Sequence, residues 1–282
     1  MPELPELEVV KEVLRRRVVG TTIEAVEVVP PGGPAVVRDL TRVGFSQALT
    51  GATIGAVDRR GKCLLFLIER AGAPVGSRLH LVLNPKLTGR LQLVAPVEKR
   101  HSKTHVVLSL SSRDELRYVD QKQMGQLYLT CELSQVPDFE TMGPEPLAIS
   151  LDEFRARLRQ FRGEIKGILT RGELVAGIGN AYADEILWAA GIHPYRKRTQ
   201  LASEEVGRLY HAMQATLLDA VERVRVEMGE AIHLKPRDFL AVHMKSGQPC
   251  PRCGTPISAV TANQRITNFC RTCQPGGLIR GM

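Results

Sequence analysis

The stretch CPRCGTPISAVTANQRITNFCRTC, residues 250–273, contains two Cys-x-x-Cys pairs with sixteen residues between them. Four thiolates at this spacing suit a tetrahedral Zn²⁺ ion held between the ends of a β-hairpin. Because all four ligand positions are cysteines, no coordination position stays open for a reactant. The stretch therefore predicts a hairpin organised by one structural Zn²⁺ ion, with the ligands Cys250, Cys253, Cys270 and Cys273.

The residues around this hairpin are basic. Positions 244–282 include five Lys or Arg residues and no Asp or Glu. Because a zinc ion with four thiolates carries a charge of about −2, this tail keeps a net positive charge. A small basic hairpin suits the phosphate backbone of a nucleic acid. Two other interpretations stay open, namely a hairpin that only stabilises the fold and a hairpin that binds a protein.

The whole chain has the composition of a basic globular protein. Its 282 residues are enough for two domains with their own cores, and 43% of them are hydrophobic. The excess of 38 Lys and Arg over 30 Asp and Glu favours an anionic partner, nucleic acid before an anionic membrane, although ordinary basic proteins share it. The sequence has no apolar segment typical of a signal peptide or a membrane span. We therefore expect a cytoplasmic protein that is not secreted and does not bind membranes.

The hydrophobic pattern changes near Pro137–Pro146, where Pro and Gly interrupt the periodicity. Before this point, a helix over 5–17 precedes segments typical of short strands: 22–29, 62–69, 79–83, 90–94, 105–110, 116–119 and 126–130. Beyond it, helical spacing predominates over 151–160, 165–170, 180–190 and 203–228. We predict an α+β protein with an N-terminal β-sandwich or barrel at 1–136, a helical domain at 137–244 and the zinc hairpin at 245–282.

A glycine-rich turn leads into one of the predicted helices, in the stretch VAGIGNAYADEILW, residues 175–188. Gly177 and Gly179 allow a tight turn, and Asn180 is a favourable helix cap. The N–H groups at such a helix start can bind an anion, for example a DNA phosphate. Many buried helices begin in the same way, so the motif is weak by itself. Lys166 could add charge to the same phosphate or simply lie on a solvated helix face.

A second candidate is Lys62, in the stretch Arg59-Arg60-Gly61-Lys62 before the apolar run Cys63–Ile68. The glycine predicts a turn that places Lys62 at the start of a strand. From there its ammonium could reach a phosphate or a leaving group. In isolation, a solvated turn is the simpler interpretation.

The first residues, MPELPELE, allow two interpretations. Removal of Met1 would expose the secondary amine of Pro2, and an α-amino group with a pKa of about 7.7–8.0 is partly nucleophilic at neutral pH. Its attack on a carbonyl-like carbon gives a cationic iminium, with Glu3 available to move protons. Alternatively, Pro5 and Glu6 mark the start of a helix, where proline and acidic residues are favoured.

These motifs occur in the same order as in the formamidopyrimidine-DNA glycosylase and endonuclease VIII family, and the chain resembles that family over nearly its whole length. The resemblance rests on the N-terminal PELPE, the RRGK turn, the glycine–asparagine motif followed by GIHP at 191–194, and the zinc hairpin. It implies a β-sandwich with flanking helices, a helix-two-turn-helix domain and a zinc hairpin. It also implies a bifunctional DNA glycosylase and abasic-site lyase of base excision repair, with damaged double-stranded DNA as its partner and oxidised purines such as formamidopyrimidine and 8-oxoguanine as leading substrates.

The resemblance also implies roles for single residues. Pro2 would attack C1′ of the deoxyribose and expel the base, while Glu3 moves protons as the sugar ring opens. Lys62 would contact phosphate and the sugar oxygen, and Glu6 would buttress the site. β-Elimination and δ-elimination would then cut the strand on both sides. The phosphates flanking the lesion would be bound by Lys166, Asn180 and Arg265.

The sequence departs from the family where residues fill the space left by the extruded base. Family members commonly use Met, Arg and Phe, and this chain has Leu87, Gln123 and Met124. Leu87 can still act as an apolar wedge. Gln123 can bond an orphaned base but lacks the charge and planar fork of Arg, and Met124 is more flexible than Phe. Lys122 is a further DNA-binding candidate in the same stretch.

These departures leave the lesion and the preferred opposite base open, as does the loop over 229–238, which lacks the usual Gly-, Ser- and Thr-rich start. The alternatives are a glycosylase for oxidised pyrimidines and a protein that binds lesions or abasic sites with weak catalysis. A zinc-ribbon transcription factor would not explain the N-terminus or the glycine–asparagine turn. One active site per chain favours a monomer. The resemblance implies a prokaryotic-type protein that is associated with the nucleoid in the cytoplasm.

Overall fold

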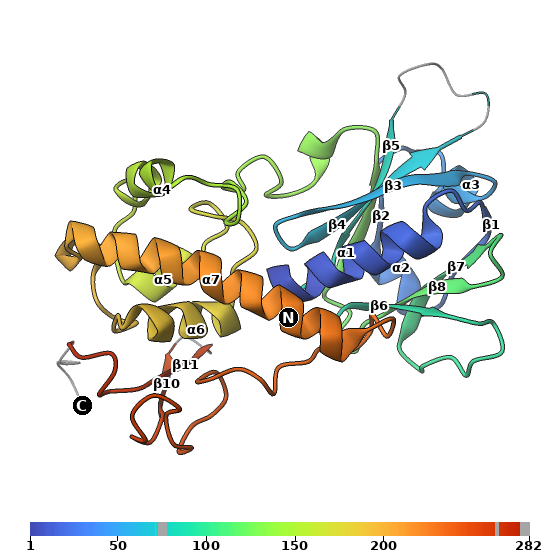
Figure 1. Cartoon of the computed structure of the whole chain (residues 1–282). Helices are drawn as coiled ribbons and strands as arrows, with labels where there is room; N and C mark the ends of the chain where they lie inside the picture. The colour runs from blue at the N-terminus through green and yellow to red at the C-terminus, as the bar shows by residue number, and fades with distance from the viewer. Residues whose placement is uncertain (71, 73–77, 263–264, 277–282) are drawn as a thin grey trace. The chain divides into compact units, whose positions relative to one another are not determined.

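The computed structural model describes residues 1–70, 72, 78–262 and 265–276, so Arg280 of the basic tail lies outside the described residues. These residues form two compact units (Figure 1). Unit 1 contains residues 1–141 and 224–236, and unit 2 contains residues 142–223 and 237–282. The three sequence ranges given above stay a prediction. Among the described helices, none is long and apolar enough to cross a membrane.

Unit 1 is built on two sheets. The four-stranded sheet has the order β1-β7-β8-β6 and is antiparallel throughout, with β1 Ile23–Val28, β7 Thr104–Leu110, β8 Glu115–Val119 and β6 Arg90–Val94. The five-stranded sheet has the order β2-β9-β5-β4-β3, with β2 Val37–Asp39, β9 Gln126–Thr130, β5 Leu79–Asn84, β4 Cys63–Glu69 and β3 Thr53–Arg60. Its β2–β9 pair is parallel and its other pairs are antiparallel.

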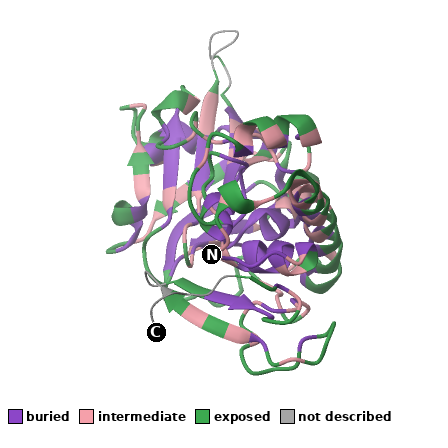
Figure 2. Ribbon diagram, turned by 90° about the vertical axis from the view of Figure 1, so that its left-hand side faces the viewer, coloured by how far each residue is buried: buried purple, intermediate pink, exposed green. Residues whose placement is uncertain are grey.

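Helix α1, Leu4–Val18, begins at the N-terminal motif and packs on β3 and β4. Its apolar residues recur at helical spacing and are buried: Leu4, Leu7, Val10, Val13 and Leu14. Figure 2 shows this buried layer continuing into the strands of the sheets. The short helices α2, Gly33–Val36, and α3, Phe45–Leu49, complete the described helices of residues 1–70.

Residues 224–236 belong to unit 1 although they begin within helix α7, Ser203–Met228, whose earlier residues belong to unit 2. Two sets of ion pairs fasten them to α1. Two nitrogens of the Arg225 guanidinium, Nε and Nη2, each lie 2.9 Å from a carboxylate oxygen of Glu12. Further along, the carboxylate of Glu230 lies 2.9 Å from Nη2 of Arg16 and 3.2 Å from Nη1 of Arg17. We call residues 224–236 the return segment.

Unit 2 is mainly helical, with α4 Leu151–Leu158, α5 Ile165–Leu169, α6 Asn180–Ala190 and α7 Ser203–Met228, whose last residues belong to unit 1. Its core is a cluster of buried side chains from all four helices, which includes Phe154, Leu169, Tyr182, Leu187 and Leu209. The chain then forms a hairpin of β10, Ser258–Ala262, and β11, Arg265–Phe269, paired from Ser258 with Phe269 to Ala262 with Arg265.

The structure confirms the α+β class, the N-terminal sheets, the helical region and the hairpin. The bounds of α6 and α7 coincide with the predicted ranges. Strands β2 and β3 were not predicted. The predicted start of a strand at Lys62 is wrong, because Gly61 and Lys62 form the turn between Arg60 and Cys63, and Gly61 adopts a φ of +55° that favours glycine.

Candidate functional site

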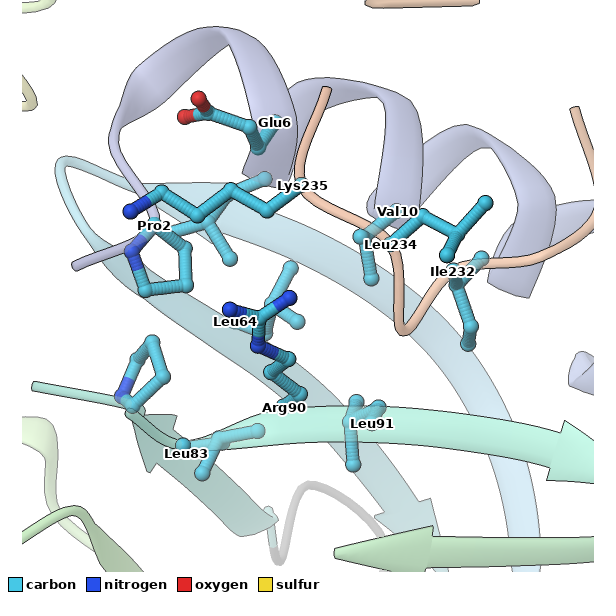
Figure 3. Close-up of a pocket in the computed structure, with 13 residues that line it drawn as sticks. Pro2, Glu6, Val10, Leu64, Leu83, Arg90, Leu91, Ile232, Leu234 and Lys235 are labelled. Atoms are coloured by element: carbon cyan, nitrogen blue, oxygen red, sulfur yellow. The ribbon is translucent and has the colours of Figure 1, made fainter. Parts of the chain in front are cut away.

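The N-terminus of α1 lies at a pocket of unit 1 (Figure 3). Pro2 and Glu6 line it from the N-terminal motif, and Leu64 and Leu83 line it from strands β4 and β5. Arg90 and Leu91 of β6 line another part of the pocket. The return segment completes the lining with Ile232, Leu234 and Lys235. Pro2 and the carboxylate of Glu6 therefore lie at one small, largely apolar pocket together with the cationic side chains of Arg90 and Lys235.

Both predicted acidic residues of this motif are buried. Glu3 and Glu6 are each 2% exposed, and the backbone N–H of Glu3 donates a hydrogen bond of 2.8 Å to Oε2 of Glu6. Glu6 thus satisfies a backbone donor at the helix start, as an acidic residue in a first turn does. This bond fixes the backbone directly after Pro2. The helix-entry interpretation is confirmed, and it is compatible with a nucleophile held rigidly at position 2.

Lys62 lies half-buried in the two-residue turn that joins β3 to β4. Arg59 ties this turn to α1, because its Nε donates to Oε2 of Glu8 at 2.7 Å and its Nη1 donates to the carbonyl oxygen of Gly61 at 2.9 Å. Burial raises the pKa of Glu8, but the hydrogen bonds from Lys11 and Arg59 outweigh it and leave the pKa below its usual value. The turn that carries Lys62 is therefore fastened to the helix that begins beside Pro2.

Leu87, Lys122, Gln123 and Met124 lie in two turns that one carboxylate holds together, that of Asp120. Oδ1 of Asp120 accepts from the hydroxyl of Thr88 and, at 3.2 Å, from the N–H of Lys122. Oδ2 accepts from Met124 N at 2.9 Å and from Gly125 N at 2.8 Å. Leu87 is 44% exposed and Met124 is 47% exposed. Two apolar side chains are thus presented to solvent from a rigid base.

The hydroxyl of Tyr118 also donates to Oδ2 of Asp120, at 3.0 Å. Its position leaves room only for glycine at two neighbouring positions, 89 and 125. A Cβ atom at Gly125 would lie 1.9 Å from this hydroxyl oxygen, and one at Gly89 would lie 2.4 Å from it. Since real Cβ atoms do not approach oxygen so closely, any other residue would displace the ring or the turn. Gly89 ends the first turn and Gly125 ends the second.

In unit 2, Lys166 and Asn180 both direct their side chains at the hairpin. Nζ of Lys166 donates to the carbonyl of Ile266 at 3.2 Å and to Oγ1 of Thr267 at 2.8 Å, and it lies 2.7 Å from Oδ1 of Asp184. Asn180 Nδ2 donates to the same Ile266 carbonyl at 2.8 Å. The predicted cap role of Asn180 is wrong, because the cap is Gly179 and the Asn180 amide bonds β11 instead.

Lys166 is buried, so the solvated-face interpretation is also wrong. Arg265, the third predicted phosphate ligand, is exposed at the start of β11, directly before Ile266. Lys166 of α5 and Asn180 of α6 thus donate to one backbone carbonyl of β11, and Arg265 directly precedes this residue in the chain.

A second carboxylate of α6 fastens the chain that leads into the hairpin. Glu185 accepts hydrogen bonds from three consecutive N–H groups, those of residues 241, 242 and 243, at 2.8–2.9 Å. Burial is the largest influence on this group and raises the pKa of Glu185 despite these bonds. Nδ1 of His243 lies 2.8 Å from Oδ2 of Asp184. Asp184 and Glu185, adjacent in sequence, therefore join α6 to the chain that enters the hairpin, and Asp184 also accepts from the N–H of Asn268 in β11.

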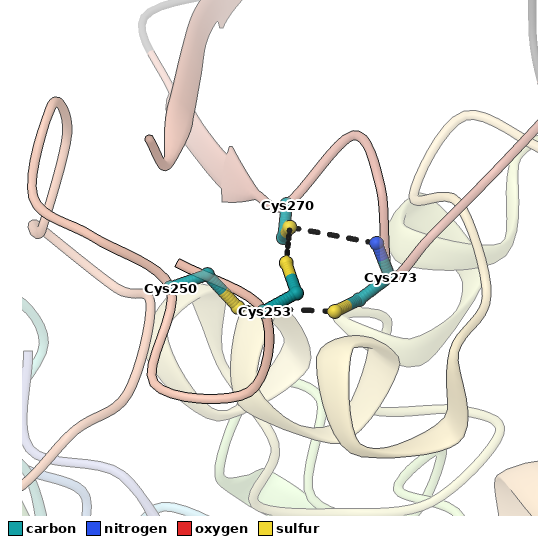
Figure 4. A group of neighbouring side chains, drawn as sticks. All are labelled: Cys250, Cys253, Cys270 and Cys273. Carbon is teal, nitrogen blue, oxygen red and sulfur yellow. Dashed lines mark hydrogen bonds between the residues drawn. The ribbon is translucent and has the colours of Figure 1, made fainter. Parts of the chain in front are cut away.

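The four predicted zinc ligands converge at the end of the hairpin (Figure 4). Their sulfur atoms all lie within 4.8 Å of one another, with Cys250 Sγ 3.8 Å from Cys273 Sγ and Cys253 Sγ 3.4 Å from Cys270 Sγ. Tetrahedral zinc with Zn–S bonds of about 2.3 Å separates its sulfur ligands by roughly 3.8 Å. The cluster therefore fits one Zn²⁺ ion with only small adjustments.

The surroundings of the four thiols differ in how far they favour ionisation. Hydrogen bonds from Thr255 lower the pKa of Cys253 to about 6, whereas burial and the neighbouring cysteines raise the pKa of Cys273 to about 12. A divalent cation supplies the positive charge that lets all four thiols ionise together. Trp188 Nε1 donates to Cys250 Sγ at 3.4 Å, and the guanidinium of Arg252 stacks over the Trp188 ring at 4.3 Å. The metal site is thus anchored on α6.

Sequence reasoning missed four residues that organise these sites: Asp120, Asp184, Glu185 and Lys235. The two adjacent acidic residues in the apolar helix 180–190 were a usable signal, because buried carboxylates need partners. Asp120 and Lys235 carried no local signal, since their roles depend on chain segments that meet only in the fold.

Comparisons with known proteins agree with these sites. Models of the formamidopyrimidine-DNA glycosylase N-terminal domain, of the H2TH domain of that enzyme and of a zinc finger found in FPG and IleRS match residues 1–127, 142–230 and 247–276. A formamidopyrimidine-DNA glycosylase of Symbiobacterium thermophilum is 38% identical over 98% of this chain and 90% of its own length. One of Moorella thermoacetica is 38% identical over 92% of this chain and 94% of its own.

Solved structures agree as well. The Lactococcus lactis Fpg in complex with abasic-site DNA has a TM-score of 0.84 at 30% identity, over 97% of this chain and 100% of that one. MutM in complex with DNA containing carbocyclic 8-oxo-G has a TM-score of 0.82 at 32% identity, over 98% and 100%. With all three domain models in order and relatives matched almost end to end, the chain belongs to the formamidopyrimidine-DNA glycosylase family.

Proposed function

We propose that this chain, a DNA glycosylase of base excision repair by its family, is bifunctional and also cleaves the DNA strand, with the amine of Pro2 as nucleophile. The observation that carries the proposal is the buried start of α1, where Pro2 and Glu6 line one pocket and Glu3 follows directly. Because Pro2 carries an amide nitrogen while Met1 is attached, the active protein must begin at Pro2. Zinc keeps a structural role, because its four cysteine ligands leave no position for a reactant.

In the proposed reaction, the lone pair of the Pro2 nitrogen forms a bond to C1′, and the glycosidic bond breaks with its electron pair leaving on the base, which takes a proton from water. The carboxylate of Glu3 accepts the proton that the Pro2 nitrogen loses and gives it to the ring oxygen O4′ as the sugar opens, which leaves an iminium at C1′. The iminium acidifies C2′, and loss of a C2′ proton expels the 3′ phosphate by β-elimination. A further proton loss expels the 5′ phosphate by δ-elimination. Lys62 contacts phosphate and the sugar oxygen in this scheme, and Glu6 holds the backbone of Glu3.

We propose that damaged double-stranded DNA binds to unit 2 through phosphates at Asn180 and Arg265, with the charge of Lys166 beside them. The solved relatives are complexes with DNA that contains an abasic site or carbocyclic 8-oxo-G, which supports DNA as the partner. The ammonium hydrogens of Lys166 are directed at Asp184, Thr267 and Ile266, so its proposed contribution is a fixed positive charge. Such contacts make binding strongly salt-dependent. We propose a monomer that acts in the cytoplasm on nucleoid DNA.

We propose oxidised purines as the substrate class, with Leu87, Lys122, Gln123 and Met124 at the site of the extruded base. The exposure of Leu87 and Met124 on a rigid base supports a wedge that enters the base stack. Base extrusion is the usual solution for enzymes that act on a base within a duplex. A preference for oxidised pyrimidines is the alternative, which the substitutions at these positions leave open.

Borohydride trapping tests this function. The protein is incubated with duplexes that contain an oxidised purine, an oxidised pyrimidine or an abasic site, and the reduced adduct is mapped by peptide mass spectrometry. We expect the adduct on the peptide that begins with Pro2, a weakened adduct for Pro2→Gly, and loss of base excision for Glu3→Gln. The matched control is Glu27→Gln, an exposed glutamate of β1 paired with Arg100.

Two outcomes contradict the proposal. If active protein retains Met1, Pro2 is not the nucleophile. If every duplex fails to give an adduct while a gel shift still shows lesion-selective binding, the chain is a lesion-binding protein without efficient catalysis.

A further inference from the structure

Lys235 is a charged residue of the N-terminal pocket that no motif indicated. It lines the same pocket as Pro2 and Glu6. In Figure 3 its aliphatic chain runs along the pocket, and its ammonium group points toward Pro2. The residue comes from the return segment, more than two hundred positions along the sequence from Pro2.

Contacts with α1 and with β6 hold the return segment, and with it Lys235, at the pocket. Glu230 forms ion pairs with Arg16 and Arg17 of α1. Ile232 is 3% exposed and fills part of the pocket. Nη1 of Arg90, on β6, donates to the carbonyl oxygen of His233 at 2.9 Å. The backbone before Lys235 is thus tied to both the helix and the sheet that form the pocket.

The charges that face Pro2 come from three elements. Glu6 on α1, Arg90 on β6 and Lys235 on the return segment are the charged residues among the described lining residues, and Glu3 follows Pro2 in the chain. The carboxylates favour a protonated amine, whereas each nearby cation disfavours it. Replacement of Lys235 by a neutral residue therefore shifts the balance toward the protonated form, whatever the other groups contribute.

We propose that the ammonium of Lys235 keeps the Pro2 amine unprotonated at neutral pH and so makes the nucleophile available. This inference rests on the proposed role of Pro2. On an abasic site, the lone pair of the free amine adds to the C1′ aldehyde and the N–H proton passes to the aldehyde oxygen. A further proton from Glu3 lets this oxygen leave as water, which gives the iminium. A protonated amine has no lone pair for this bond. A cation next to a reactive amine is an established way to activate it.

The first experiment measures adduct formation against pH on an abasic duplex, at saturating protein so that weaker binding does not enter. We expect the midpoint for Lys235→Met to lie about one pH unit above that of the unaltered protein. Well below both midpoints, the rate is then about tenfold lower. Lys235→Arg keeps the charge and should keep the midpoint. The matched control is Lys99→Met, which removes the same charge at an exposed position of unit 1.

The second experiment needs no DNA. The free protein is methylated with formaldehyde and borohydride, and the extent of methylation of the Pro2 peptide is followed by mass spectrometry against pH. Because only the unprotonated amine reacts, we expect the same upward shift for Lys235→Met. Coincident midpoints for Lys235→Met and the unaltered protein in both experiments overturn the role of Lys235. A protein that shows the methylation shift yet gives no DNA adduct contradicts instead the proposed function.

Discussion

Nζ of Lys166 lies 2.7 Å from Oδ1 of Asp184, and the two side chains are 8% and 0% exposed. Asp184 also lies 2.8 Å from Nδ1 of His243 and accepts a hydrogen bond of 3.2 Å from the N–H of Asn268. One carboxylate of α6 therefore connects α5, the chain that enters the hairpin, and β11. Lys166 and Asn180 also donate to the carbonyl of Ile266, and the proposed phosphate ligand Arg265 directly precedes Ile266 in β11.

We expect Asp184→Asn to lower the free energy of unfolding by about 3 kcal/mol or more, because it leaves the buried Lys166 without its counter-charge. Urea unfolding measures this change. The control is Asp219→Asn, which breaks an exposed pair with Arg223 and should cost about 0.5 kcal/mol or less. Equal midpoints for the two variants would show that the buried pair does not stabilise unit 2.

Asp120 should make the stability of unit 1 depend on acid pH. Burial raises the pKa of Asp120, but the hydrogen bonds from Thr88, Gly125, Tyr118 and Lys122 outweigh it and leave the pKa below its usual value. Because the folded-state pKa is lowered, the stabilisation is complete above the unfolded value of about 3.9 and is lost as the pH falls through the folded value.

Asp120→Asn should therefore be about 1–3 kcal/mol less stable at neutral pH and show a flatter loss of stability below about pH 4. Thermal unfolding across this range measures both effects. Asp152→Asn is the control, since that side chain is 94% exposed. Parallel acid limbs for Asp120→Asn and the unaltered protein would contradict the prediction.

Removal of zinc should loosen α6 as well as the hairpin. Cys253→Ser removes one ligand, and the hydrogen bonds from Lys166 and Asn180 to Ile266 lose their fixed partner. We expect less than one zinc per chain by metal analysis, faster hydrogen exchange in 180–190 and weaker DNA binding. Cys131→Ser, at an exposed cysteine of unit 1, should leave all three unchanged. Unchanged exchange in Cys253→Ser would mean that α6 is ordered without the hairpin.

Gln123 should limit discrimination of the base opposite the lesion, because its amide lacks the charged fork of arginine. Gln123→Arg is expected to raise the ratio of excision rates opposite cytosine and opposite adenine by roughly tenfold, the range of one good bidentate contact. Single-turnover excision of an oxidised guanine in both contexts measures the ratio. Val97→Arg adds the same charge at an exposed site of unit 1. An equal rise in both variants would mean that charge alone, and not its position, is responsible.

Features set by nearby residues could be predicted from the sequence. The bounds of α6 and α7 follow from unbroken helical spacing, and the four zinc ligands follow from the spacing of their cysteines. Strand β3 escaped prediction because Gly55 and the polar run Asp58-Arg59-Arg60 interrupt its alternation. The strand forms because its partner β4 is strongly apolar and supplies the backbone pairing.

Features set by distant residues could not be predicted. The pair of Arg225 and Glu12 spans 213 positions, and nothing in either segment indicates the other. The arrival of Lys235 at the pocket also depends on long-range contacts, those of Glu230 with Arg16 and Arg17 and of Arg90 with the carbonyl of His233. The hydrogen bonds of Asp120 to both turns likewise form only when the turns at 84–89 and 120–125 meet in the fold. Pairings of this kind depend on packing, which a single sequence does not specify.

The shared anchor at Asp120 has a consequence for engineering this enzyme. The turn that carries Leu87 and the turn that carries Met124 are joined through Asp120, Thr88 and the close approach of Tyr118 to Gly89 and Gly125. A transplant of only one turn from a relative would leave the other without its matching partner. The two turns, with their carboxylate, hydroxyls and glycines, therefore form a single exchangeable cassette, and variants of either turn should be designed on the cassette as a whole.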